Sequence, residues 1–153
     1  MNQPNQTNST DEQCFLCQKH RGLQAQPPGG YIYRDALWNV CHAPCDKGPL
    51  GTLFIESQRH FLDFSEMNDE ELHNYGSICN ILYNALKKAT LAERIYSIIF
   101  LEGIPHFHVW LIPRRAGEEK GIALISKDAQ CNEQDAITLS SQLKHMLEKG
   151  PAT

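Results

Sequence analysis

The sequence predicts an α+β fold, an antiparallel sheet of about five strands with one long helix and one C-terminal helix. Residues 68–90 carry apolar side chains at the spacing of a helix, whereas the other apolar segments are mostly short and rich in β-branched and aromatic residues. Two of these short segments, 94–101 and 106–112, are joined by a tight turn, which favours an antiparallel hairpin. The 153 residues suffice for one domain with a core and are too few for two.

The first half of the chain contains short elements separated by clear breaks. Residues 1–13 are polar and are predicted to be a disordered leader, so the single domain is expected to span 14–150. A knuckle-like turn begins at Cys14, and a proline- and glycine-rich break follows it. The stretch 31–44 predicts two strands with a turn at Arg34 and Asp35, and "TLFI" at 52–55 predicts a buried strand.

The long helix has a recognisable start. Asn68 with Glu71 three residues later has the form of a capping box, and the helix is predicted to end near Thr90. Its apolar stripe is predicted to consist of Leu72, Tyr75, Cys79, Leu82 and Leu86.

The remaining elements follow the long helix. The hairpin strands "RIYSIIFL" and "HFHVWLI" are joined by the turn at 102–105, and "GIALIS" at 121–126 is a candidate edge strand. The final helix is predicted over 133–148 with Gly150 beyond its end. Its apolar face contains Ala136, Leu139, Leu143, Met146 and Leu147.

Composition narrows the classes of function. The net charge is −4 without a long basic run, which argues against a dedicated nucleic-acid or membrane surface but permits a local cationic pocket. No signal-peptide pattern is found, and no apolar run approaches the ~18 residues of a membrane span, so a cytoplasmic protein is expected. In a reducing compartment, the six cysteines are expected to be metal ligands or small core residues; Cys79 and Cys131 are expected to be packing residues.

The stretch "GIPHFHVWLIPR" carries the candidate chemistry. In a strand, His106, His108 and Trp110 share one face, and the apolar Phe107, Val109 and Leu111 share the face directed at the core. Two adjacent imidazoles on a sheet face permit three interpretations: both bind one metal, one is a nucleophile, or both hydrogen-bond a ligand.

Three segments together resemble the histidine triad (HIT) family. "PHFHVWLIPR" resembles its signature, in which histidines alternate with apolar residues before a Pro-Arg pair. "GTLFIESQRHFLDFSEMNDEEL" resembles the strand, basic-His pair and helix start that precede the family's long helix, and "CFLCQKHRG" resembles the start of its zinc-bearing bacterial members. The resemblance runs from Cys14 to Arg115 and implies the HIT-like fold.

The resemblance implies separate roles for the two histidines. His108 matches the residue that attacks the α-phosphorus of a nucleotide and carries the nucleotidyl group until water hydrolyses it. The zinc-bearing relatives imply a structural zinc held by Cys14, Cys17, His60 and His106. Symmetric homodimers are usual in the family, so a homodimer is also expected.

The segment "CHAPC" is a rival candidate for a metal site. "CHAPC" places Cys41, His42 and Cys45 within five residues, but no fourth ligand is apparent nearby. His42 is expected near the ligand pocket instead. His20, His73 and His145 are predicted to be surface residues.

The sequence departs from the family at the third triad position, where Trp110 replaces histidine. Indole offers one N–H donor and no proton to transfer, so Trp110 is expected to contact substrate without acting as a general acid. Loss of acid catalysis typically costs around 10²- to 10⁴-fold in rate. In the nucleoside pocket, Asn39 corresponds to the family's ribose-binding acid, with His42 as the other candidate.

Three hypotheses result. The first is a nucleotide phosphoramidase or nucleotide hydrolase that cleaves an adenosine phosphoramidate or a dinucleoside polyphosphate through His108. The second is a nucleotide-binding module with a structural zinc that lost its chemistry at Trp110. The third is a zinc enzyme with an open metal site formed by His106 and His108.

Overall fold

Five antiparallel strands form one sheet in the order β1-β2-β3-β5-β4. The computed structural model describes residues 12–150. The strands are β1 (Tyr31–Arg34), β2 (Trp38–His42), β3 (Leu53–Ser57), β4 (Arg94–Ile98) and β5 (His108–Arg114). The five-stranded antiparallel sheet predicted from the sequence is confirmed, including the hairpin that begins at Tyr31.

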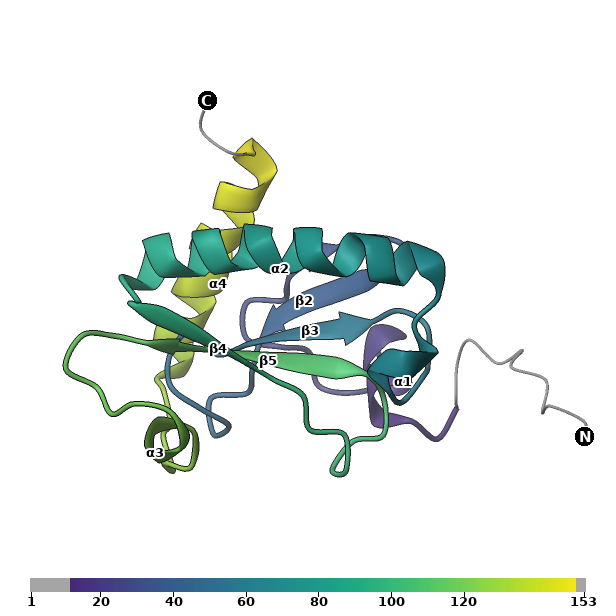
Figure 1. Cartoon of the computed structure of the whole chain (residues 1–153), viewed down its shortest axis with the longest axis horizontal. Helices are drawn as coiled ribbons and strands as arrows, with labels where there is room; N and C mark the ends of the chain where they lie inside the picture. Colours follow the sequence, from purple (N-terminus) through teal and green to yellow (C-terminus); the bar gives the residue numbers. More distant parts are fainter. Residues whose placement is uncertain (1–11, 151–153) are drawn as a thin grey trace, which may run out of the picture.

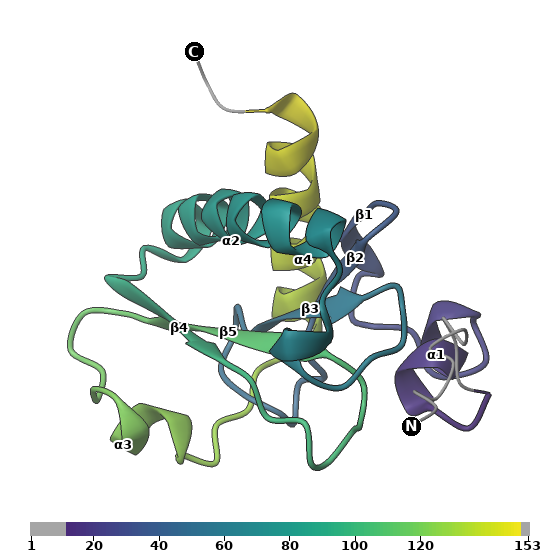
Figure 2. The same ribbon diagram turned by 45° about the vertical axis from the view of Figure 1, so that its right-hand side comes forward.

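The helices lie on different sides of this sheet. The two long helices, α2 (Asp69–Thr90) and α4 (Glu133–Lys149), cover one face (Figures 1 and 2). The short helix α3 (Ile122–Ile125) lies on the other side, and α1 (Phe15–His20) lies at the end of the sheet opposite to α3 (Figure 1). A 3-10 turn, η1 (Phe64–Glu66), precedes α2. The sheet face away from α2 is therefore only partly covered.

Strand alternation separates the core from this second face. Phe107, Val109 and Leu111 have no exposed surface and belong to the main core, as the sequence predicted. Across the neighbouring strands, Ile55 pairs with Val109 and Val40 pairs with Ile55, so a continuous apolar layer faces α2 and α4.

The capping box predicted for α2 is confirmed, but the apolar stripe differs at its first turn. The Asn68 side chain accepts from the Glu71 N–H at 2.9 Å, and the Glu71 carboxylate accepts from the Asn68 N–H at 2.9 Å. Leu72, predicted to be buried, is 46% exposed. Glu71 is buried there instead, because Arg59 pairs with its carboxylate at 2.9 Å. Further along α2, Ile78 and Ala85 join Leu82 and Leu86 as buried positions.

The prediction of a tight turn at 102–105 between the last two strands is wrong. β4 ends at Ile98 and β5 begins at His108, so the connection runs over residues 99–107. The backbone of Phe107 explains the difference: its N–H donates to Phe61 O at 2.7 Å, and its carbonyl accepts from Ser57 N–H at 3.1 Å. The chain just before β5 therefore pairs with the last residue of β3 and the segment after it, and not with β4.

The edge strand predicted at 121–126 is also wrong, because this segment forms α3. Gly121 has a φ of 62°, and its carbonyl accepts from the N–H groups of Leu124 and Ile125 at 3.1 and 3.2 Å. Leu124 is buried, whereas Ile122 is 76% exposed. A short apolar run is compatible with either a strand or a helical turn, and here the turn conformation at Gly121 decides.

The C-terminal helix is confirmed over Glu133–Lys149, with Gly150 at its end. The leader predicted for residues 1–13 lies almost entirely outside the described residues, and its disorder stays a prediction. Within residues 12–150, no helix combines the length and apolar character needed to cross a membrane.

We expect Asn68→Ala to lower the free energy of unfolding by about 1 kcal/mol, because it removes the acceptor for the Glu71 N–H at the start of α2. Urea unfolding measures this. Asn84→Ala is the matched control: Asn84 is exposed within the same helix, and alanine there should be neutral or slightly stabilising. Equal losses in both variants would contradict the capping role.

Candidate functional site

The sheet face that turns away from α2 carries most of the residues that the sequence indicated. Cross-strand pairing aligns two rows on this face, Asn39–Glu56–His108 and Cys41–Phe54–Trp110. The rings of Phe54 and Trp110 meet edge to face with centroids 4.7 Å apart, and Phe54 also contacts the His108 ring at 5.9 Å. His108 therefore lies on an aromatic and polar surface and not in the core.

A cavity of about 480 Å³ opens over this surface. His108, Trp110, Phe54 and Glu56 contribute from the sheet, and Phe15, Leu16 and Lys19 contribute from α1. The remaining walls come from 25–28, Pro44, Cys45, Lys47, Ile104 and Glu133. The lining is largely apolar with a few polar groups near His108, which is the usual character of a small-molecule site.

The predicted metal ligands Cys14, Cys17, His60 and His106 come together at the end of the sheet near α1. Their ligand atoms all lie within 4.8 Å of one another. The Nδ1 atoms of His60 and His106 are 3.1 Å apart, and the Sγ atoms of Cys14 and Cys17 lie 3.4 and 3.5 Å from His106 Nδ1. Tetrahedral zinc with ordinary bond lengths places its ligand atoms roughly 3.3–3.8 Å apart, so the cluster fits that ion.

The His106 ring is held in the form that binds a metal. Its Nε2 lies 2.7 Å from Ser57 O, which makes Nε2–H the donor and leaves the Nδ1 lone pair directed at the cysteines. Burial lowers the pKa of His106 to about 4, so its imidazole is neutral at pH 7. Two thiolate candidates and two imidazoles are a donor set typical of a closed structural zinc site.

The same residue orients His108 through its backbone. The Nδ1–H of His108 donates to the His106 carbonyl at 2.7 Å. His108 Nε2 then has the free lone pair, and it makes no hydrogen bond within residues 12–150. The open metal site suggested for His106 and His108 is therefore not formed, because the His108 ring lies outside the four-ligand cluster.

Trp110 lies beside His108 without a polar partner. Its indole N–H is buried and has no hydrogen-bond acceptor in the described part of the chain. Edge-to-face contact with Phe54 holds the ring in place. Trp110 thus presents a broad apolar surface to the cavity, and its buried N–H supplies no transferable proton.

The structure does not bring the two expected nucleoside contacts to the cavity wall. Asn39 shares the row of Glu56 and His108, but its Oδ1 accepts from Arg34 Nε at 2.8 Å and from Gln58 Nε2 at 2.9 Å. His42 pairs with Leu53 and faces the α2 side of the sheet. There, His42 Nδ1–H donates to Ala43 O, and Nε2 accepts from Gly51 N–H at 2.9 Å.

The rival "CHAPC" segment forms no metal cluster among residues 12–150. Strand alternation places Cys41 and His42 on opposite faces of the sheet. Burial raises the pKa of the Cys41 thiol, as does the neighbouring Glu56, and a neutral thiol is a poor metal ligand.

The sequence did not reveal a buried ion pair beside His108. Lys19 Nζ lies 2.5 Å from Glu56 Oε1, and His20 Nε2 lies 2.8 Å from Glu56 Oε2. The His20 side chain is only 8% exposed, so its prediction as a surface residue is wrong; His73 and His145 are exposed as predicted. A lysine and a histidine two and three residues after Cys17 look like a solvated turn in sequence, and only the position of α1 over β3 pairs them with Glu56.

The ion pair controls the charge next to His108. Glu56 is the cross-strand partner of His108 and has no exposed surface. Burial raises the pKa of Glu56, but the hydrogen bond from His20 and the charge and hydrogen bond of Lys19 outweigh it and hold the pKa below its usual value. Glu56 is therefore ionised, and Lys19 neutralises it at the cavity wall.

Comparison with solved structures identifies the fold as that of histidine triad proteins. A HIT-like protein involved in cell-cycle regulation from Bartonella henselae superposes with a TM-score of 0.69 at 16% identity, over 88% of this chain and 96% of that chain. A hypothetical histidine triad nucleotide-binding protein from Sulfolobus tokodaii gives 0.71 at 16% identity, over 89% and 93%. A zinc-bound histidine triad family protein from Mycobacterium smegmatis gives 0.70 at 16% identity, over 91% and 98%.

Comparison by sequence gives a different result. No family model matches the chain, and no curated protein matches it. At 16% identity the structural likeness establishes the fold, so the roles of individual residues depend on the geometry of this site.

We expect Lys19→Met to lower the free energy of unfolding by about 3 kcal/mol or more, because it leaves the buried Glu56 carboxylate without its cation. The double variant Lys19→Met/Glu56→Gln should recover most of this loss. Urea unfolding measures both. Lys47→Met is the matched control, since it breaks an exposed 3.9 Å contact with Asp46 and should cost less than about 1 kcal/mol. A double variant no more stable than Lys19→Met would contradict the pairing.

Proposed function

We propose that this protein is a nucleotide hydrolase in which His108 Nε2 attacks the α-phosphorus of a bound nucleotide. One observation carries the proposal: the hydrogen bond from His108 Nδ1–H to the His106 carbonyl, which leaves Nε2 as the nucleophilic nitrogen beside the cavity. The histidine triad fold supports it, as does the similarity to a protein described as nucleotide-binding.

The reaction has two displacements. In the first, the Nε2–P bond forms and the bond from phosphorus to the leaving group breaks. In the second, water attacks phosphorus, the P–N bond breaks, and a proton from the water is released to solvent. His108 retains its Nδ1 proton on the His106 carbonyl throughout, so the ring alternates between neutral and nucleotidylated forms. Adenosine phosphoramidates and dinucleoside polyphosphates are the substrate classes that the resemblance implies.

We further propose that Cys14, Cys17, His60 and His106 hold a structural zinc ion. Four protein ligands complete a tetrahedral site and leave no position for substrate, so the ion would supply stability and no chemistry. The ion would tie α1 to the segment after β3 and to the residue that orients His108.

A nucleotide-binding module without turnover is the second candidate, and Trp110 favours it. The tryptophan at this position cannot protonate a departing amine or alkoxide. A chain with an intact cavity would therefore bind nucleotide and release it unchanged. Formation of a covalent intermediate distinguishes the two candidates.

The homodimer expected from the resemblance is part of the same proposal. β4 is an edge strand, and α2 exposes Leu72 and Ile81, so an open strand edge and an apolar helix surface are available to a second copy. A cytoplasmic location stays a prediction.

We expect wild-type protein mixed with adenylylated substrates, including dinucleoside polyphosphates and adenosine 5′-phosphate esters, to accumulate an adenylylated form that intact-mass spectrometry detects. His108→Ala should give no adduct and a rate lower by about 10³-fold or more, because it removes the nucleophile. His145→Ala, an exposed histidine on α4, is the matched control and should behave as wild type. Turnover in His108→Ala at the wild-type rate would overturn the proposal.

We expect purified protein to contain about one zinc ion per chain, and His60→Ala to lose it, because the remaining three ligands form an incomplete site. Loss of the ion should lower the thermal unfolding midpoint by roughly 5–10 °C. Elemental analysis and thermal unfolding measure the two effects. His73→Ala should retain the ion; zinc content that is equal in both variants would exclude the proposed ligand set.

A further inference from the structure

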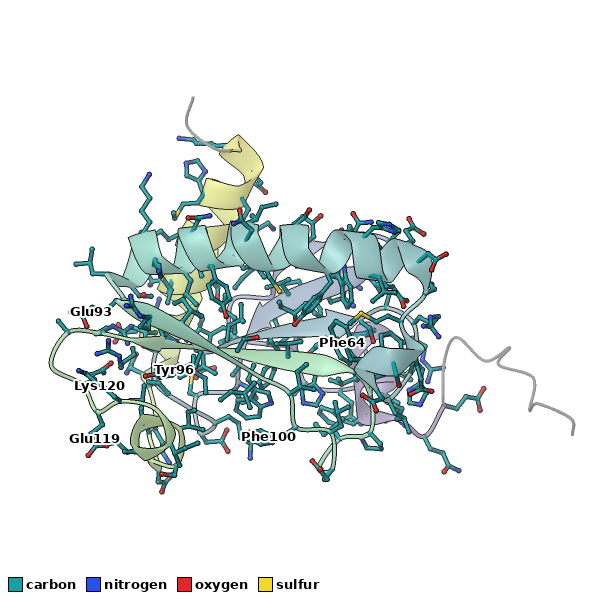
Figure 3. All side chains as sticks on the ribbon, in the orientation of Figure 1. Phe64, Glu93, Tyr96, Phe100, Glu119 and Lys120 are labelled. Carbon is teal, nitrogen blue, oxygen red and sulfur yellow. The ribbon has the colours of Figure 1, made fainter. Side chains whose placement is uncertain are left out.

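A second cavity of about 210 Å³ lies on the same sheet face, on the far side of Trp110. Ile98 and Ile112 form its floor, and Ile125 of α3 covers it. Phe100 also lines it and lies on the side of the sheet away from α2, as does Tyr96 (Figure 3). The Tyr96 hydroxyl accepts from Gly121 N–H at 2.8 Å and so holds the start of α3 against β4.

The two cavities meet at Trp110. Trp110 and Lys47 line both, so a ligand bound at His108 that extends past the indole enters the second cavity. His108 and Trp110 are two residues apart on one strand, which places their side chains roughly 6–7 Å apart on the same face. A leaving group bonded to a phosphorus atom at His108 therefore reaches the indole within a few bonds.

The chemistry available at this junction is limited. Trp110 contributes the surface of its ring; its N–H is buried without an acceptor in the described part of the chain, and indole cannot protonate a leaving group. The polar groups at the rim of the second cavity are the exposed ammonium groups of Lys47 and Lys127, and none of its lining residues is a carboxylic acid or a histidine. A leaving group that departs here does so as an anion beside apolar walls and two exposed lysines, which lie 3.9 and 4.0 Å from the carboxylates of Asp46 and Glu119.

Building on the proposed function, we propose that the substrate is a nucleoside 5′-phosphate joined to a weakly basic leaving group with an apolar body, which occupies the second cavity. His108 Nε2 forms the bond to phosphorus, and the P–O bond to the leaving group breaks. The leaving group takes the electron pair and departs as an oxyanion without a proton, past the Trp110 ring that lines both cavities. Trp110 selects for leaving groups that need no protonation, and the second cavity selects for their apolar body.

This substrate class fits the second cavity better than the two classes implied by the resemblance. An amine leaves phosphorus only when it is protonated, and Trp110 cannot supply that proton. A departing nucleoside polyphosphate is weakly basic but strongly hydrated, and burial against Ile98, Ile112 and Ile125 would remove water from its charges without replacement.

The test uses adenosine 5′-phosphate esters of substituted phenols whose leaving-group pKa ranges downward from about 10, the ordinary value of a phenol. We expect the single-turnover rate of His108 adenylylation in wild type to fall about 10²-fold or more from the most to the least acidic phenol. In Trp110→His, the adenylylation rate should fall by less than about tenfold across the same series of phenols, because the new imidazole donates a proton to the leaving group. A rate in wild type that is independent of leaving-group pKa would overturn the inference.

A second arm tests the cavity itself. Ile125→Asp and Phe100→Ala should each raise KM for the aryl esters about tenfold, while the Kd for AMP, which ends at the first cavity, stays unchanged. Ile122→Asp is the matched control because Ile122 lies on the same short helix, is 76% exposed and does not line the cavity. Equal KM values in all these variants would overturn the second-cavity assignment.

The two proposals fail in distinguishable ways. Adenylylated His108 that forms at one rate from every ester would contradict the inference and leave the hydrolase proposal standing. No adenylylated His108 from any ester in the series would overturn both.

Discussion

His106 is the residue on which the rest of the site depends. Its side chain completes the cluster of Cys14, Cys17 and His60, and its carbonyl accepts the Nδ1–H of His108 at 2.7 Å. Its Nε2–H donates to Ser57 O at the end of β3, so the ring and backbone of one residue are fixed together. Because a histidine nucleophile needs one nitrogen held as a donor, the position of His106 determines which nitrogen of His108 can react.

The segment around α1 extends this control into the cavity. Cys14 and Cys17 join the metal-ligand cluster, and the following turn brings Lys19 and His20 onto the buried Glu56, the cross-strand partner of His108. A buried pair of this kind adds little stability compared with an apolar pair of the same size, but loss of one partner is costly. Its effect here is electrostatic: Lys19 neutralises the Glu56 carboxylate, the cross-strand partner of His108, as the proposed approach of a phosphate to His108 requires.

The sequence was sufficient for the fold class and both main helices, because periodicity and the Asn68–Glu71 cap are local signals. The spacing of Cys14 and Cys17 supplies only half of a tetrahedral site, and His60 and His106 were expected from the resemblance to zinc-bearing histidine triad proteins. It was insufficient where long-range contacts decide. Phe107 pairs with Phe61 and Ser57 and so lengthens the connection after β4, and Gly121 turns an apolar run into α3. Lys19 and Glu56 are 37 residues apart, and His42 lies across the sheet from His108 only because of the register of β2 on β3. Neither the ion pair nor the face of His42 has a signature in the sequence.

The most direct measurement of the account is the tautomer of His108, read from nitrogen-15 chemical shifts of the histidine rings in protein labelled with [15N]histidine, at a pH where the free imidazole is neutral. We expect His108 to carry its proton on Nδ1, with the shift of a hydrogen-bonded donor, and Nε2 to have the shift of an unprotonated nitrogen. Removal of the proposed zinc ion should weaken this preference, since His106 would then lose one of its constraints. A proton on Nε2 of His108 in the metal-loaded protein would contradict the account, because the nitrogen directed at the cavity would have no lone pair for attack on phosphorus.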